Sequence, residues 1–242
     1  MYLYDGIGGI TIFYHAINQY LCDEKLQKNC DAFDKTLFQY TKDMLERTEG
    51  LEAESTGAFA GEASIVYIYE LLYSLTKKED YLKYAKDHAE ILKQSVIYDQ
   101  NNDIIYGNAG AIIVLVNLYH LTHDISYLEW ANIAGNNLVK NQQEGGWYNK
   151  DAEMLSGFSH GISGIMFALA ILNKENDKWE YCRAINDGII CEDTMYVEGY
   201  NNWLDNRKEA QMQADEESKF MAAWCHGAPG ILLARSKMYN LL

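Results

Sequence analysis

Segments that are apolar on nearly every side alternate with amphipathic segments along most of the chain. The first kind includes IVYIYELLYSL from Ile65 and IIVLVNLYHL from Ile112. A short polar turn such as TKKED or THDIS follows each of them. Next comes a segment such as YLKYAKDHAEILKQ from Tyr81, whose charged residues fall on one side. Helices that are apolar all round are buried, and amphipathic helices lie between a core and solvent. The pattern therefore predicts helical hairpins, each with a buried inner helix and a solvent-facing outer helix.

A glycine motif stands immediately before each predicted inner helix. Successive motifs lie about fifty residues apart, a period that is typical of repeat architectures. Glycine lets the backbone turn tightly there and lets helix ends approach closely. Stacked hairpins of this kind form a solenoid, or an α/α toroid where curvature closes the array. The closing glycines of the motifs are Gly9, Gly61, Gly110, Gly164 and Gly230.

The expected fold class is therefore all-α: a single domain over residues 1–242, built as an α/α toroid (a double helical barrel) of repeated hairpins. Five inner helices are predicted, and no outer partner follows the fifth. The ring is accordingly expected to be incomplete, with about five of seven inner helices. The segment DGIICEDTMYVEGY from Asp187 is where we expect short strands or an irregular insertion.

The composition narrows the possible partners. The formal net charge of −15 argues against nucleic acid, whose binding needs clustered lysines and arginines. The longest strongly apolar stretch, residues 111–119, is too short to span a bilayer, and the start lacks the basic segment of a secretory signal. Five cysteines form an odd number without a disulfide framework, which favours the reducing cytoplasm.

The glycine motifs resemble those of lanthionine synthetase C-like proteins, the cyclases that make thioether rings in lantibiotic peptides. The segments YDGIGGI, DIIYGNAG, FSHGISG and WCHGAPG are most similar to the C-terminal cyclase domain of bifunctional class II synthetases. WCHGAPG is also similar to mammalian relatives that bind glutathione. The resemblance covers nearly the whole chain, with five motifs in order, and implies an α/α toroid with a zinc ion near its mouth.

The resemblance implies that the zinc ligands are a cysteine in a W-C-x-G motif and a Cys-His pair in a later C-H-G motif. Cys225 matches the first cysteine, and the sequence ends before a later motif. The chain is therefore expected to be truncated, with an incomplete zinc site. An alternative makes Cys225 and His226 the later pair, with Cys182 or Cys191 as the first ligand. The segments around these two cysteines, EYCRAI and IICEDT, lack the W-C-x-G context.

The reaction implied is Michael addition of a peptide cysteine thiolate to a dehydrated serine or threonine. His160 matches the family's catalytic histidine, which can take the thiol proton or protonate the enolate. Asp103 matches the aspartate beside that histidine. His226 is expected to contact substrate, and Trp224 to be a packing residue. Where stand-alone cyclases carry an arginine shortly before the W-C motif, KFMAAWC offers Lys219.

The implied partners are a dehydrated precursor peptide and a dehydratase domain or enzyme. Two other functions stay open. A glycoside hydrolase or lyase on a similar toroid would use carboxylates such as Asp103, Asp151 and Glu153. A non-catalytic module would hold a peptide or glutathione without turnover. The remaining histidines are expected to be structural or solvated, without partners; they are His15, His88, His120 and His123.

Overall fold

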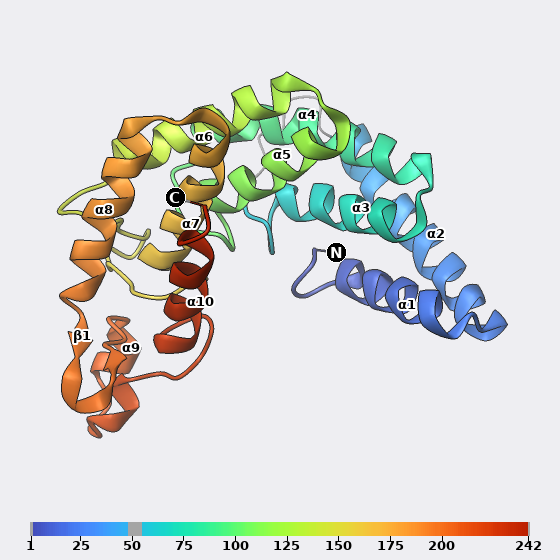
Figure 1. Cartoon of the computed structure of the whole chain (residues 1–242). Coiled ribbons are helices and arrows are strands. Elements are labelled where there is room, and N and C mark those ends of the chain that lie inside the picture. The colour runs from blue at the N-terminus through green and yellow to red at the C-terminus, as the bar shows by residue number, and fades with distance from the viewer. Residues whose placement is uncertain (1, 48–54, 242) are drawn as a thin grey trace.

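The helices of the chain follow one another around an open arc, as Figure 1 shows for this computed structural model, which describes residues 2–47 and 55–241. Inner helices alternate with outer helices along the arc, as predicted. The inner helices are α1 (Ile7–Leu21), α3 (Glu62–Thr76), α5 (Asn108–Thr122), α7 (Ile162–Asn176) and α10 (Ala228–Met238). The outer helices are α2 (Glu24–Arg47), α4 (Glu79–Tyr98), α6 (Ile125–Asn141) and α8 (Trp179–Asp193).

Burial separates the two kinds of helix as their hydrophobic patterns predict. Helix α5 buries consecutive residues from Asn108 to Ile112, so that neighbours contact it on every side. Helix α4 instead buries Ala85, Ala89 and Leu92 at intervals of three to four residues, which places them along one stripe. No helix in the described part of the chain is long and apolar enough to cross a membrane.

The first four inner helices end in the same way. Each is 15 residues long. Each is followed by a residue in the left-handed region, whose N–H donates to the carbonyl four residues back; these residues are Cys22, Lys77, His123 and Asp177. This turn reverses the chain into the outer helix, so the polar connections lie at the end of each inner helix that is remote from its glycine motif.

The glycine-motif loops (2–6, 55–61, 101–107, 155–161 and 221–227) lie side by side at the other end of the inner helices. Each loop is hydrogen-bonded to the next one along the chain. The bonds join Tyr4 N–H to Phe59 O (3.2 Å), Ala58 N–H to Ile104 O (2.9 Å), Ile104 N–H to Ser159 O (3.2 Å) and Ser159 Oγ–H to Cys225 O (3.4 Å). The glycine motifs therefore gather at one end of the inner helices.

Two glycines show why the motif needs this residue. At Gly164 a Cβ atom would collide with the carbonyl of Phe158, so the first turn of α7 needs the missing side chain for close approach. At Gly227, which precedes α10, φ is 95°, in the left-handed region that favours glycine. The close approach recurs, since a Cβ would also collide with the carbonyl six residues earlier at Gly9, Gly110 or Gly230. Among the glycines that directly precede inner helices, the positive φ is particular to Gly227.

The segment between α8 and α10 carries the irregular insertion. The first half of the segment from Asp187 belongs to α8, which continues to Asp193 with buried residues Gly188 and Glu192 one helical turn apart. The expected short strands and irregular structure begin in its second half and continue beyond it. The insertion contains β1 (Tyr196–Val197), a 3-10 turn (Glu198–Tyr200), β2 (Asn202–Trp203), α9 (Lys208–Gln211) and a second 3-10 turn (Glu217–Lys219).

Candidate functional site

A cavity of about 1060 Å³ opens where the glycine-motif loops meet the insertion. Asp103, Tyr106, His160, Arg207 and His226 are among its lining residues. They come from three different loops and from the insertion. Residues that are more than a hundred positions apart in sequence are therefore brought to one wall.

His160 and Asp103 form a hydrogen-bonded pair at this wall. Nδ1 of His160 lies 2.9 Å from Oδ2 of Asp103, and the two side chains are 32% and 15% exposed. Oδ1 of Asp103 accepts the backbone N–H of Tyr106 at 2.7 Å. The Tyr106 ring stacks on the imidazole with a centroid distance of 5.7 Å. The loop thus holds the carboxylate in place, and the carboxylate orients the imidazole.

His226 lies next to the same imidazole. The rings of His160 and His226 stack with centroids 6.1 Å apart. His226 is 4% exposed, and its buried Nδ1 has no hydrogen-bond partner among the described residues. Burial lowers the pKa of His226, and the charge of Arg207 lowers it further. The ring is therefore neutral at pH 7.

Cys225 is partly exposed and directly precedes His226 in the chain, but it is not among the residues that line the cavity. Within residues 2–47 and 55–241, no three His, Cys, Asp or Glu side chains are grouped so that they could hold a metal ion. The alternative ligands lie on α8, where Cys182 Sγ is 3.1 Å from Asn173 Nδ2 and Cys191 is partly exposed. These residues do not complete a zinc site, which needs three protein ligands for catalysis.

The cation of the site was missed from the sequence. Lys219, which the sequence offers where stand-alone cyclases have an arginine, has its Nζ 2.6 Å from the Glu216 carboxylate and does not line the cavity. Arg207 lines the cavity instead, and its Nη2 lies 2.6 Å from Oδ2 of Asp205. Burial raises the pKa of Asp205, but the hydrogen bonds that Arg207 donates to the carboxylate have the larger combined effect. The pKa of Asp205 therefore lies below its usual value. The same pairing raises the pKa of Arg207.

Trp224 has the packing contacts expected of it. Its ring lies 5.8 Å from that of Phe59 and 6.0 Å from that of Phe158, measured between centroids. These two phenylalanines belong to the second and fourth glycine-motif loops. Trp224 therefore joins loops that are not neighbours in the hydrogen-bonded row.

Three of the remaining histidines have partners, contrary to the expectation. Buried His15 lies 2.9 Å from Asp34, buried His88 lies 2.5 Å from Glu62, and exposed His120 lies 3.1 Å from Glu175. The partners are 19 to 55 positions away in sequence, so local pattern does not reveal them. His123 ends α5 as the left-handed residue.

The carboxylate of Glu153 does not suit glycoside hydrolysis. Its oxygens accept hydrogen bonds from Asn149 Nδ2 and from the backbone N–H of Lys208, both at 2.9 Å. These bonds lower the pKa of Glu153. A glycosidase instead needs one carboxylic acid whose pKa is raised so that it can protonate the leaving group.

Comparison with known proteins places these features in a family. A family model described as lanthionine synthetase C-like protein matches residues 1–242. The lacticin 481/lactococcin biosynthesis protein LcnDR2 of Lactococcus lactis subsp. lactis is 26% identical over 244 residues, which cover 96% of this chain and 23% of that protein. The chain thus spans about a quarter of the length of this relative.

Solved structures agree on the fold. Nisin cyclase matches 99% of this chain with a TM-score of 0.72 and 17% identity, and 65% of that chain is covered. A glycosyl hydrolase family 88 protein from Bacteroides vulgatus matches 96% of this chain and 73% of its own, with a TM-score of 0.58 and 14% identity. The predicted α/α toroid class is confirmed by both. The toroid is shared with glycosyl hydrolases, but the family model covers every residue, and the chain belongs to the lanthionine synthetase C-like family.

Proposed function

We propose that this chain provides the cyclase chemistry of lantibiotic-type peptide maturation, in which a peptide cysteine adds to a dehydrated serine or threonine. Membership of the family supports this proposal, and LcnDR2 is itself named for lacticin 481/lactococcin biosynthesis. The observation that carries it is the His160–Asp103 pair, held in a large cavity beside His226. A hydrogen-bonded histidine at a cavity wall is suited to move a proton.

The pair supplies a general base and then a general acid. With the Nδ1 proton donated to Asp103, the lone pair of His160 is on Nε2. Nε2 takes the proton from the peptide thiol, and the sulfur attacks the β-carbon of the dehydrated residue. A C–S bond forms, and the electron pair of the C=C bond moves to give an enolate. The imidazolium then returns the proton to the α-carbon, so that atoms and charge balance.

The cavity suits an extended peptide. Its volume of about 1060 Å³ is at the upper end of small-molecule pockets. Side-chain amides line it, and each can donate and accept hydrogen bonds with a peptide backbone; they are Gln100, Asn101, Asn102, Asn141, Gln143 and Asn149. A dehydration reaction must supply the substrate, so a dehydratase domain or enzyme is the partner we propose.

The proposal for zinc is limited to Cys225. A thiolate there would be one ligand, and the described residues do not provide the other two. No step of the scheme above is therefore assigned to a metal. This incomplete set of zinc ligands among the described residues also favours a second candidate function. That function is a non-catalytic module that holds a peptide or glutathione in the cavity without turnover.

Cyclisation of a dehydrated, cysteine-containing precursor peptide tests the proposal. The assay uses the natural full-length polypeptide. The loss of free thiols from the peptide is measured by alkylation and mass spectrometry. His160→Asn should lower kcat by about 10²- to 10⁴-fold, because the proton-transfer group is lost. His120→Asn is the matched control, since His120 pairs with Glu175 on the surface. Peptide binding without any loss of thiol in the wild type would favour the non-catalytic module.

A further inference from the structure

The Asp205–Arg207 pair has its two ends in different surroundings. The Asp205 side chain is 2% exposed, whereas that of Arg207 is 35% exposed and lines the cavity with His160 and His226. Nε and Nη2 of Arg207 donate to the Asp205 carboxylate at 2.6 to 3.1 Å. Because the carboxylate is buried and the guanidinium is not, the pair is a dipole whose positive end faces the cavity.

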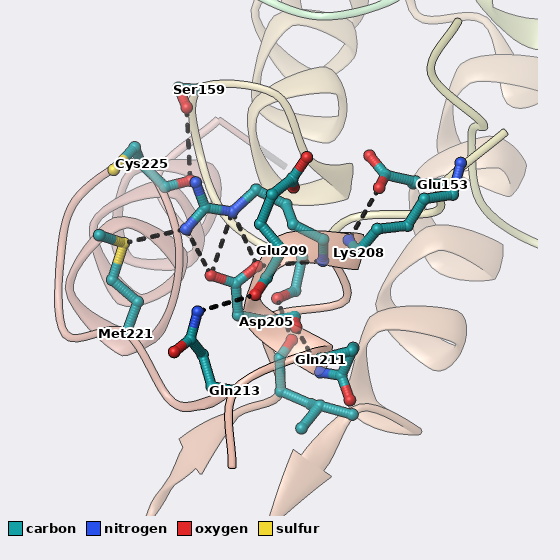
Figure 2. A network of polar contacts seen from close by, with 12 residues as sticks. Glu153, Ser159, Asp205, Lys208, Glu209, Gln211, Gln213, Met221 and Cys225 are labelled. Carbon is teal, nitrogen blue, oxygen red and sulfur yellow. Dashed lines mark hydrogen bonds and ion pairs between the residues drawn. The ribbon is translucent and has the colours of Figure 1, made fainter. Parts of the chain in front are cut away.

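Asp205 is itself fixed by its neighbours. Its backbone N–H donates to Lys219 O at 2.9 Å, and its carbonyl accepts Gln211 Nε2 at 2.6 Å. Figure 2 shows Asp205 within this network, with Met221 and Cys225 on one side and Lys208 on the other. The guanidinium is therefore held in place before any ligand arrives. Donors that are fixed in advance stabilise a developing negative charge without having to reorganise.

Arg207 differs from the other cations at the cavity wall. Lys150 and Lys208 are exposed, and Nζ of Lys208 donates to the Asp151 carbonyl at 2.7 Å. Arg207 is half-buried, and its Nη1 has no hydrogen-bond partner among the described residues. A buried carboxylate thus orients one guanidinium edge and leaves another nitrogen for a ligand.

We propose that Arg207 is a catalytic residue that binds the enolate oxygen, and that Asp205 is its positioning residue. This inference rests on the proposed cyclisation. As the C–S bond forms, the electron pair of the C=C bond moves onto the adjacent amide carbonyl, and negative charge gathers on that oxygen. Nη1–H of Arg207 donates to this oxygen. When His160 protonates the α-carbon, the carbonyl is restored and the interaction weakens.

This role predicts a loss in kcat without a matching loss in KM, because the charge exists only after sulfur attack. Arg207→Gln should lower kcat by about 10²- to 10³-fold, the usual effect of removing one donor to an oxyanion, and KM should change less than about two-fold. Arg207→Lys should recover part of the rate. Asp205→Asn should also lower kcat, and adding it to Arg207→Gln should cause no further loss, since it acts through Arg207.

Arg183→Gln is the matched control for these variants. It breaks another Arg–Asp pair, between Arg183 and Asp187 on the exposed side of α8. Its kcat should equal that of the wild type. A loss in Arg207→Gln that appears only in KM, or an unchanged kcat, would overturn the enolate role.

A second measurement separates this inference from cyclisation itself. Sodium acetate, a delocalised oxygen anion, is titrated into the protein against sodium chloride at constant ionic strength, and backbone amide shifts are followed by NMR. We expect saturable shifts around Arg207 that persist in Arg183→Gln and vanish in Arg207→Gln. Shifts that are unchanged in Arg207→Gln, or absent in the wild type, would overturn the anion site. Acetate binding by a protein that never cyclises peptide would instead overturn the proposed function and leave the anion site standing.

Discussion

Buried carboxylates in this acidic protein pair with basic side chains from other elements. Asp34 pairs with His15, Glu62 with His88, and Glu192 with Arg235. Each pair links two helices and offsets the cost of burying a charge. Glu70 on α3 is an exception, because it is 2% exposed and neither of its carboxylate oxygens has a hydrogen-bond partner among the described residues. Burial raises the pKa of Glu70 well above its usual value.

Glu70→Met should therefore stabilise the protein at neutral pH. Between the unfolded pKa of a glutamate, about 4.3, and its raised folded pKa, the unfolded chain is ionised and the folded one is not. Stability then falls as pH rises through this window, and the methionine variant escapes that loss. The melting temperature of Glu70→Met should exceed that of the wild type at pH 7.5, and the gain should shrink at pH 4.

Glu129→Met is the matched control, since Glu129 is exposed on α6. It should show no gain that depends on pH. A gain for Glu70→Met of the same size at pH 4 and pH 7.5 would contradict the protonation argument and leave only better packing as its cause.

The residues of the site differ in how far sequence could reveal them. His160 and Asp103 lie in glycine-motif loops, so their resemblance to the family's motifs identified both, and the structure places them 2.9 Å apart. Arg207 lies in the insertion, which has no repeat and no hydrophobic period. Its place depends on Asp205 and on how the insertion folds over the cavity. Such tertiary placement leaves no local pattern, which is why the sequence did not identify Arg207.

At the scale of elements, the repeated helix start controls the position of the site. Each inner helix begins at a glycine, and its motif loop bonds to the next loop in the row. The hydrophobic pattern and the glycine spacing were enough to predict the inner and outer helices. The sequence did not reveal the end of α8, because its last residues are polar while its buried stripe continues to Glu192.

Gly164→Ala should destabilise the protein more than an average surface change. A Cβ at Gly164 would collide with the Phe158 carbonyl, so the loop or α7 has to move. The expected loss is on the order of 1–3 kcal/mol in the free energy of unfolding. Gly199→Ala is the control, because nothing lies within 4 Å of a Cβ built there. Denaturant unfolding measures both, and equal midpoints for the two variants would remove the close-approach argument.

At the scale of the molecule, the arc brings together the His160–Asp103 pair and Arg207, while no two further metal ligands stand with Cys225 among the described residues. The proposed proton transfer and charge stabilisation therefore use groups other than the proposed metal ligand. The two halves should therefore be separable by experiment.

We expect the purified 242-residue chain to hold zinc weakly. One thiolate cannot hold the ion in a catalytic geometry, which uses three protein ligands. After dialysis against a mild chelator, elemental analysis should find far less than one zinc per chain. Cys22→Ala is the control, since Cys22 is exposed at the end of α1. Stoichiometric zinc that survives dialysis and is lost only in Cys225→Ala would show that a complete ligand set is present.

The equal lengths of the first four inner helices have a practical consequence for engineering. An α-helix rises about 1.5 Å per residue, so the left-handed turns after the 15-residue inner helices lie about 22 Å from their glycine loops. Chain added at these turns does not have to pass the cavity. Dyes, affinity tags or an inserted domain placed after Lys77, His123 or Asp177 should therefore leave the cavity wall intact, and these three positions are natural attachment points for following peptide capture in single molecules.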